Sequence, residues 1–256
     1  RQQHDIGNFG DHVESLLLLH PDHGEIRCGP VEHADLLDLT IGGFGLTGWI
    51  LELTIRLQPL GGRSIERRVH TARDFEDAVD IMEANDRPGT HLYSWNDGNR
   101  RGAGFGRGVV FEERFVDDPD GTTRRPRFRR LTAEGRGRLV PLPIWNRATT
   151  TLVNEVYFQR ERRRRPRTMA ALAAAFPING KEGYFHAFGR RGFHEYQIIV
   201  ARDRWAETVD TVRESIDRHR ACITLASLKL FRGEPRHLWF RGCLLYTSDA
   251  ADDETS

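Results

Sequence analysis

Lysine, cysteine and long apolar runs are all scarce in this chain of 256 residues. Lysine occurs only at Lys181 and Lys229, so arginine supplies nearly all of the basic charge. That skew is typical of a GC-rich genome, so an arginine cluster by itself indicates no function. The three cysteines, Cys28, Cys222 and Cys243, have no CxxC spacing, which excludes a disulfide framework and a zinc site. No apolar run approaches the ~20 residues that cross a bilayer.

The chain also lacks an excess of charge of either sign. The chain has 38 basic and 37 acidic residues and a formal net charge of +1, so overall charge predicts no polyanionic partner. Hydrophobic residues at 38% and charged residues at 29% are typical of a soluble globular chain. The length fits one large domain or parts of two.

Both ends of the sequence are unusual. The chain begins Arg1-Gln2-Gln3-His4 without a methionine, and no signal peptide is visible. Residues 243–252 read CLLYTSDAAD, a string that resembles a translated sequencing adapter. We therefore expect a metagenomic fragment whose natural part ends near Gly242 and whose residues 243–256 are a non-native tail. A genuine acidic tail is the alternative.

The first 60 residues predict short strands and turns. Val13–Leu19 and Glu25–Arg27 flank the turn Pro21–Gly24, which indicates a β-hairpin. Glu32–Leu39 predicts a short helix. Apolar and polar residues alternate over Trp49–Leu57, which predicts a half-buried strand.

Gln58–Gly62 reads as a linker, and the segment after it predicts an antiparallel sheet with helices on one face. No internal repeat with a period of 20–50 residues is visible. The polar segment Asp117–Gly137 predicts a surface loop. The expected strands are 65–70, 91–95, 108–115, 153–159, 193–201 and 221–231. The expected helices are 74–85, with Thr71 as a possible N-cap, 168–176 (or a loop) and 205–220.

The glycines of residues 42–48 have the spacing GGxGxxG. A dinucleotide-binding Rossmann turn needs a helix directly after the glycines. A strand is expected there, so the Rossmann interpretation is rejected. The glycines would still let a planar or phosphorylated ligand approach the backbone closely. A tight turn without a ligand is the alternative.

Three further segments are candidates for chemistry. The loop from His4 to His12 combines polar side chains with glycines, and His4 is better placed in it than His12. Lys229 lies in an apolar strand, where an ammonium group is costly to bury unless it is paired. Arg124–Arg130 and Arg162–Arg165 could bind phosphate or nucleic acid, but no nucleic-acid motif accompanies them, so a solvated surface is favoured.

A family resemblance rests on the segments HDIGNFGDHVESLLLL, HGEIR and TIGGFGLTGWILELTIRLQP within residues 4–60. These resemble the FAD-binding domain of the vanillyl-alcohol-oxidase/PCMH-type flavoproteins. Within that superfamily the likeness is to sugar oxidases of the decaprenylphosphoryl-β-D-ribose 2′-oxidase type. The likeness continues through residues 93–95, 106–108, 192–197 and 228–231.

The resemblance implies an α+β fold in three parts. Residues 1–61 would be the C-terminal half of a PCMH-type FAD-binding domain, with the pyrophosphate-binding half upstream. Residues 62–242 would be a substrate (cap) domain with a large antiparallel sheet covered by helices. The adapter-like tail would be residues 243–256.

The resemblance also assigns roles to single residues and no metal ligands. Lys229, Gln197 and Glu195 would be the catalytic candidates, and Trp95 and Tyr157 would form the wall of the substrate pocket. Two departures from the family pattern are Arg1-Gln2-Gln3-His4, where the family has KNHH, and Glu195, where it has a glutamine. The residues expected to bind FAD are His4, Gly7, Asn8, Phe9, Gly43, Gly45, Thr47 and Ile50.

The implied reaction is the oxidation of an alcohol carbon, a sugar hydroxyl, by hydride transfer to the flavin of FAD. Lys229 would stabilise the developing alkoxide or the reduced flavin, and Glu195 and His4 are the candidate bases. The fragment itself is expected to be inactive.

The expected partner is a small-molecule or lipid-linked sugar, with no nucleic acid, and the electron acceptor stays open. The expected location is the cytoplasm or, through a lipid-linked substrate, the membrane periphery. Two alternatives remain: a non-catalytic phosphate- or nucleic-acid-binding protein, and an oxidase lineage that has lost its activity.

Overall fold

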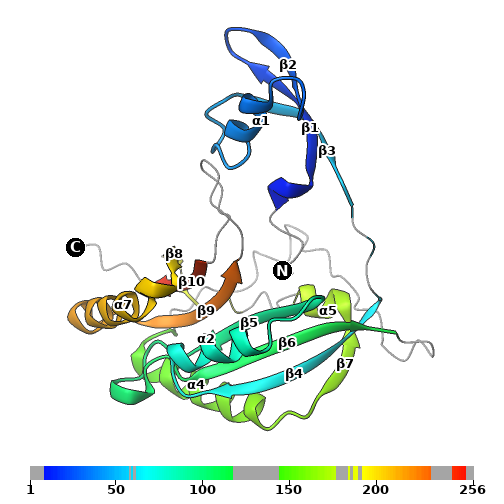
Figure 1. Ribbon diagram of the computed structural model, residues 1–256. Coiled ribbons are helices and arrows are strands. Elements are labelled where there is room, and N and C mark those ends of the chain that lie inside the picture. The colour runs from blue at the N-terminus through cyan, green and yellow to red at the C-terminus, as the bar shows by residue number, and fades with distance from the viewer. Residues whose placement is uncertain are drawn as a thin grey trace. The chain divides into compact units, whose positions relative to one another are not determined.

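A computed structural model describes residues 9–57, 59, 62–117, 144–176, 184, 187–189, 192–231 and 244–251. The chain divides into two compact units, which are described separately (Figure 1). The small unit comprises residues 2–60 and 231–244, and the large unit comprises residue 1, residues 61–230 and residues 245–256. Within the described residues, no helix has the length and apolar character that crossing a membrane requires.

The small unit is a three-stranded antiparallel sheet in the order β2-β1-β3. The predicted hairpin, short helix and following strand are all confirmed. The elements are the 3-10 turn η1 (Phe9–His12), β1 (Val13–His20), β2 (Gly24–Cys28), α1 (Ala34–Thr40) and β3 (Trp49–Ile55).

The core of the small unit lies between the hairpin and α1. Leu16, Leu18 and Cys28 from the strands are buried against Leu37 of the helix. The prediction that β3 is half-buried is wrong, because every residue of Trp49–Ile55 is exposed. β3 is an edge strand, and no described element packs over its apolar side chains.

The large unit is built on a seven-stranded sheet in the order β7-β4-β6-β5-β9-β10-β8. The confirmed predictions are β4, β5, β6, β8, β9, α2 and α7. The strands are β4 (Ser64–Ala72), β5 (Thr90–Asn96), β6 (Gly108–Val116), β7 (Arg167–Ala170), β8 (His194–Ala201), β9 (Ile223–Phe231) and β10 (Leu244–Ala251). The helices are α2 (Phe75–Ala84), α4 (Arg147–Arg162), α5 (Ala171–Ala175) and α7 (Trp205–His219), with the 3-10 turns η2 (Gly102–Gly104) and η4 (Arg202–Arg204).

The sheet repeats one topological motif, although the sequence shows no repeat. β4, α2, β5 and β6 follow one another, and β6 lies between β4 and β5. β8, α7, β9 and β10 follow the same order, and β10 lies between β9 and β8. The two motifs meet where β5 runs antiparallel to β9, with Asn96 opposite Ala226. The large sheet is therefore two strand-helix-strand-strand motifs joined edge to edge, with β7 added as a seventh strand beside β4.

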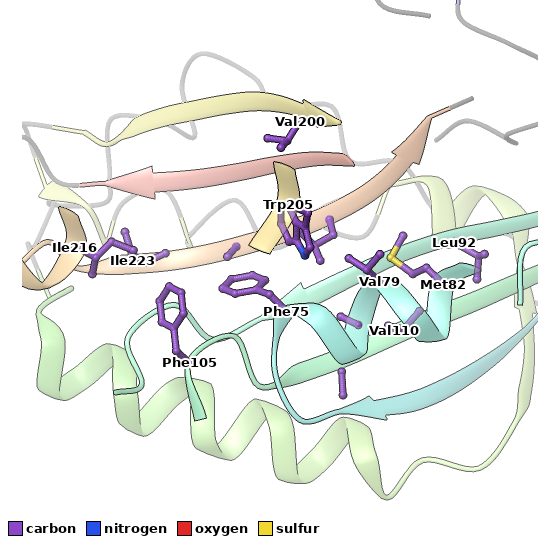
Figure 2. Close-up of a cluster of buried hydrophobic side chains, with 14 residues drawn as sticks. Phe75, Val79, Met82, Leu92, Phe105, Val110, Val200, Trp205, Ile216 and Ile223 are labelled. Carbon is purple, nitrogen blue, oxygen red and sulfur yellow. The ribbon is translucent and has the colours of Figure 1, made fainter. Parts of the chain in front are cut away.

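Helices α2 and α7 seal one face of this sheet (Figure 2). Phe75 of α2 and Trp205 of α7 meet edge to face, with ring centroids 6.3 Å apart. Ala226 and Leu228 of β9 and Val200 of β8 are buried in the same cluster. Arg202 also bridges the two motifs, because its guanidinium pairs with three acidic side chains of α2: Glu76, Asp80 and Glu83.

Helix α4 covers part of the opposite face, so the prediction of helices on one face only is wrong. Phe158 of α4 packs with Trp95, Val109 and Phe111 of the sheet. This difference arises from residues 153–159. The sequence predicted a strand there, but in the structure these residues belong to α4. Asn146 is the missed signal, because its side chain caps the helix by accepting from the backbone nitrogens of Ala148 and Thr149 at 3.0 Å.

Two other predictions of local structure need correction. The N-cap of α2 is Asp74, which accepts from the backbone nitrogen of Asp77 at 2.8 Å, and Thr71 belongs to strand β4. Residues 168–176 are divided between strand β7 and the short helix α5, where one helix or loop was expected. Of the polar loop 117–137, only Asp117 lies among the described residues.

The segment interpreted as an adapter-derived tail includes strand β10. Leu244–Ala251 lies between β9 and β8, the position equivalent to β6 in the first motif. The foreign origin of residues 243–256 stays a prediction.

The sealed face should dominate the stability of the large unit. Replacing the fully buried Leu228 with alanine leaves a cavity and should lower the free energy of unfolding by about 2–5 kcal/mol. Leu225 lies on the same strand, is 38% exposed and is the matched control, for which the loss should be about 1 kcal/mol or less. Chemical denaturation of both alanine variants measures the difference, and equal losses would contradict this view of the core.

Candidate functional site

The glycine turn after α1 is held in place by backbone contacts. The nitrogens of Gly43 and Leu46 donate to the carbonyls of Thr40 and Gly43 at 3.1 and 2.9 Å. A Cβ at Gly43 would lie 2.2 Å from the carbonyl oxygen of Leu39, so only glycine fits there. Thr47 is tied to the helix, because its hydroxyl lies 2.9 Å from that of Thr40. The turn is followed by strand β3, which confirms that this is not a Rossmann turn.

The same turn presents open backbone beside apolar side chains. Gly45 has a φ of +76°, and a Cβ there would meet nothing within 4 Å. Phe44 and Leu46 on either side are 87% and 85% exposed. Ile50 and, elsewhere in the small unit, Phe9 are also exposed. This surface can accept a flat apolar group over an unobstructed stretch of main chain.

The second group of candidates shares one face of the large sheet. Ala226 and Leu228 point into the α2/α7 core, so Lys229 lies on the opposite face of β9. The same alternation places Glu195 and Gln197 on that face of β8, because Ile198 and Val200 pack into the α2/α7 core.

Trp95 lies on this opposite face as well. Its partner across the face is Tyr157 of α4, whose ring centroid is 4.7 Å away. Burial raises the pKa of Tyr157 to about 12, and the Glu161 carboxylate acts in the same direction. Tyr157 is therefore neutral at physiological pH and suits a wall position better than that of a base.

Glu195 and Gln197 form a polar pair on the part of this face that lies over β8. The amide nitrogen of Gln197 donates to a carboxylate oxygen of Glu195 at 2.6 Å, and both side chains are exposed. Lys229 on β9 is half-buried. The face thus combines a cation, a carboxylate and an amide. Trp95 of the aromatic wall is only 9% exposed, because it packs under Tyr157 and Phe158 of α4.

A buried cluster of polar side chains beneath the aromatic wall was not predicted from the sequence. Arg67 donates to Glu113 at 2.7 Å, and the Tyr93 hydroxyl donates to the same carboxylate at 3.0 Å. Arg67 and Glu113 are directly opposite each other on β4 and β6, a register that spacing along the chain does not reveal. The group braces Tyr93, whose ring stacks on Phe111.

A second cluster of polar side chains connects helix α4 to the residues that flank η2. Glu155 accepts hydrogen bonds from Arg100 at 2.8 Å and Arg107 at 2.7 Å. The bond from Arg107, and then that from Gln159, lowers the pKa of Glu155 to about 2. Asn154, the preceding residue, donates to the buried Asp97 at 2.9 Å.

The structure divides the predicted site residues between the two units. Lys229, Gln197, Glu195, Trp95 and Tyr157 belong to the large unit. Phe9, Gly43, Gly45, Thr47 and Ile50 belong to the small unit. His4, Gly7 and Asn8 lie outside the described residues. Among the described residues, no group of three or more His, Cys, Asp or Glu side chains could hold a metal ion.

The comparisons relate this chain to proteins about twice its length. No protein-family model matches it. It is 30% identical over 214 residues to an uncharacterized protein in the mprA 5′ region of Streptomyces coelicolor, covering 77% of this chain and 56% of that protein. It is 25% identical over 243 residues to decaprenylphosphoryl-β-D-ribose oxidase of Mycolicibacterium smegmatis, covering 90% of this chain and 51% of the oxidase. The chain thus spans about half the length of the curated relatives it matches. The expected resemblance to this oxidase is confirmed as a distant sequence relationship.

The Glu155 group predicts an acid-sensitive contact. A carboxyl whose pKa is lowered by folding contributes stability above its ordinary pKa of 4.5, and that contribution is lost as the pH falls toward 2. The Glu155→Gln variant should be less stable at pH 7 by about 1 kcal/mol, because the pair is partly exposed, and should show a flatter decline below pH 4.5. Unfolding midpoints between pH 2 and 7 measure both effects, with Glu214→Gln on the exposed surface of α7 as the control. An unchanged slope in Glu155→Gln would contradict the prediction.

Proposed function

We propose that this chain is part of an FAD-dependent oxidoreductase that oxidises an alcohol carbon, most simply a sugar hydroxyl, by hydride transfer to the flavin. The observation that carries the proposal is that Lys229, Gln197, Glu195 and the buried Trp95 lie on the same face of the large sheet. The distant relationship to a protein named as an oxidase of a phosphoryl-linked ribose supports it.

Two features of the small unit support the binding of a flavin. The open backbone at Gly45 and the exposed Ile50 and Phe9 suit a planar ring with an apolar face. The fixed turn geometry would present the main chain to that ring without reorganisation, because the Gly43 and Thr47 contacts already hold it. FAD, when bound, supplies the acceptor of the hydride.

The face of the large sheet carries groups suited to acid–base and electrostatic catalysis. The Lys229 ammonium stabilises negative charge as the substrate hydroxyl loses its proton, an effect that is strong where water is excluded. Of the two candidate bases, Glu195 and His4, only Glu195 lies among the described residues. Its carboxylate would accept that proton, and the bond from Gln197 orients it. Trp95 is only 9% exposed and packs against Tyr157, so this aromatic pair would support the substrate-facing side of the sheet from beneath.

Flavin binding is the first test. The complete reading frame that contains this sequence should yield a yellow protein with the visible absorption bands of a flavin. Gly45→Val should lower its flavin content, because a side chain would stand on the open backbone and the positive φ disfavours valine. Gly24→Val is the matched control, since Gly24 also has a positive φ and open space but begins strand β2, directly after the hairpin turn. A colourless protein, or full flavin content in Gly45→Val, would overturn the assignment.

Lys229 provides the test of the catalytic face. Lys229→Met should lower kcat by about 10²-fold or more while flavin content stays constant, because a transition-state charge loses its partner. Anaerobic bleaching of the flavin by a panel of free pentoses and pentose phosphates measures the rate. Arg218→Met on the exposed surface of α7 is the control. Unchanged bleaching in Lys229→Met would remove this residue from the site.

A further inference from the structure

Helix α4 has its polar and apolar faces reversed relative to an ordinary surface helix. The residues buried against the sheet are Thr150, Asn154, Phe158 and Glu161, of which only one is apolar. The outward face instead carries Leu152, Val153 and Val156, which are 66%, 45% and 60% exposed. Leu152 and Val156 are one turn apart and lie on the same side of the helix. An apolar strip therefore faces outward along the first half of α4.

The inward polar residues are satisfied, so the reversal is a stable feature of the fold. Asn154 donates to Asp97 at 2.9 Å. The Thr150 hydroxyl lies 3.3 Å from the Cys222 sulfur. Glu161 pairs with Arg164 at 3.1 Å. Turning the helix about its axis would bury the valines and leave these polar partners unmatched, at a cost in free energy for each buried group.

Arginines continue the outward face into the second half of the helix and beyond. Residues 160–167 contain six arginines and one glutamate. Arg160 lies four residues and Arg163 seven residues after Val156, so both share its side of the helix. Arg160, Arg162, Arg163 and Arg165 are exposed. The two glutamates of α4 are engaged elsewhere, Glu155 with Arg100 and Arg107, and Glu161 in the buried face.

We propose that the outward face of α4 and the arginines after it form a docking surface for an anionic lipid bilayer. The apolar strip Leu152–Val156 would enter the boundary between headgroups and acyl chains, and the arginines would pair with anionic headgroups. An apolar strip joined to a basic cluster is the arrangement of helices that lie in the plane of a membrane interface. All of these residues belong to the large unit, and membrane docking through them does not depend on the proposed redox function.

A nucleic acid fits this surface less well. Single-stranded nucleic acids are held by aromatic stacking together with basic residues, and the outward face of α4 carries no aromatic side chain. Binding through the arginines alone would leave the aliphatic strip in water. A bilayer uses both halves of the surface, and this decides between the two partners.

Flotation with lipid vesicles tests the proposal on the full chain. The protein should float with phosphatidylcholine vesicles that contain 30% phosphatidylglycerol and should not float with vesicles of pure phosphatidylcholine. Arg163→Gln with Arg165→Gln should lower the partition coefficient about 30-fold, because each arginine near an anionic surface contributes roughly fivefold. Leu152→Ser with Val156→Ser should lower it about tenfold, because insertion of the apolar strip is lost.

Matched controls separate this surface from general charge and from misfolding. Arg87→Gln with Arg218→Gln makes the same change in net charge on exposed residues that belong neither to α4 nor to the arginines after it, and should leave flotation unchanged. Thermal unfolding of each variant checks its fold, and the arginine pair 163 and 165 lies outside the packed face of α4. Flotation that is equal in wild type and both α4 variants overturns the proposal. The proposal is also overturned if a single-stranded oligonucleotide abolishes vesicle binding while Leu152→Ser with Val156→Ser has no effect on it. A wild-type dimer that is lost in Leu152→Ser with Val156→Ser would overturn it as well.

Discussion

The sealing of one face of the large sheet by α2 and α7 is the constraint on which the rest of the structure depends. Side chains along a strand alternate between the two faces, so filling one face with an apolar core assigns every second residue to the other. The Phe75–Trp205 contact joins the two helices above this face. Arg202, just before α7, adds an ion pair to Glu76 of α2. Lys229, Glu195, Gln197 and Trp95 reach their common face because their neighbours along the strands are needed in the core.

Helix α4 shows how buried polar groups can decide the orientation of a helix. Its inner face matches a surface of the sheet that is itself partly charged, since Arg67 and Glu113 form a buried ion pair there. A buried ion pair adds little net stability compared with apolar residues, but breaking one is costly, so such pairs favour a single arrangement. The apolar residues of α4 are displaced outward as a consequence. Its exposed strip is therefore a product of the packing beneath it.

Much of the fold was predictable because local signals and tertiary demands agree. The hairpin turn at Pro21–Gly24 and the alternation in β8 and β9 gave correct elements, since turn chemistry and a period of two are short-range properties. The segment 153–159 failed because its apolar residues suit a strand as well as a helix. Only the cap at Asn146 distinguishes the two. The predicted burial of β3 was wrong for another reason. The alternation of a strand shows which side chains are suited to burial, but whether they are buried depends on what packs over them.

The α+β class, the glycine turn, the candidate residues and the family resemblance that connects them could all be inferred from the amino-acid sequence. These follow from residue type and short spacing. Tertiary structure alone decided that Lys229, Gln197, Glu195 and Trp95 share a face, and that Arg67 meets Glu113 across 46 positions of chain. It also decided that α4 turns its aliphatic side chains outward. Strand order, register and helix orientation depend on contacts between distant segments, and no pattern within one segment encodes them.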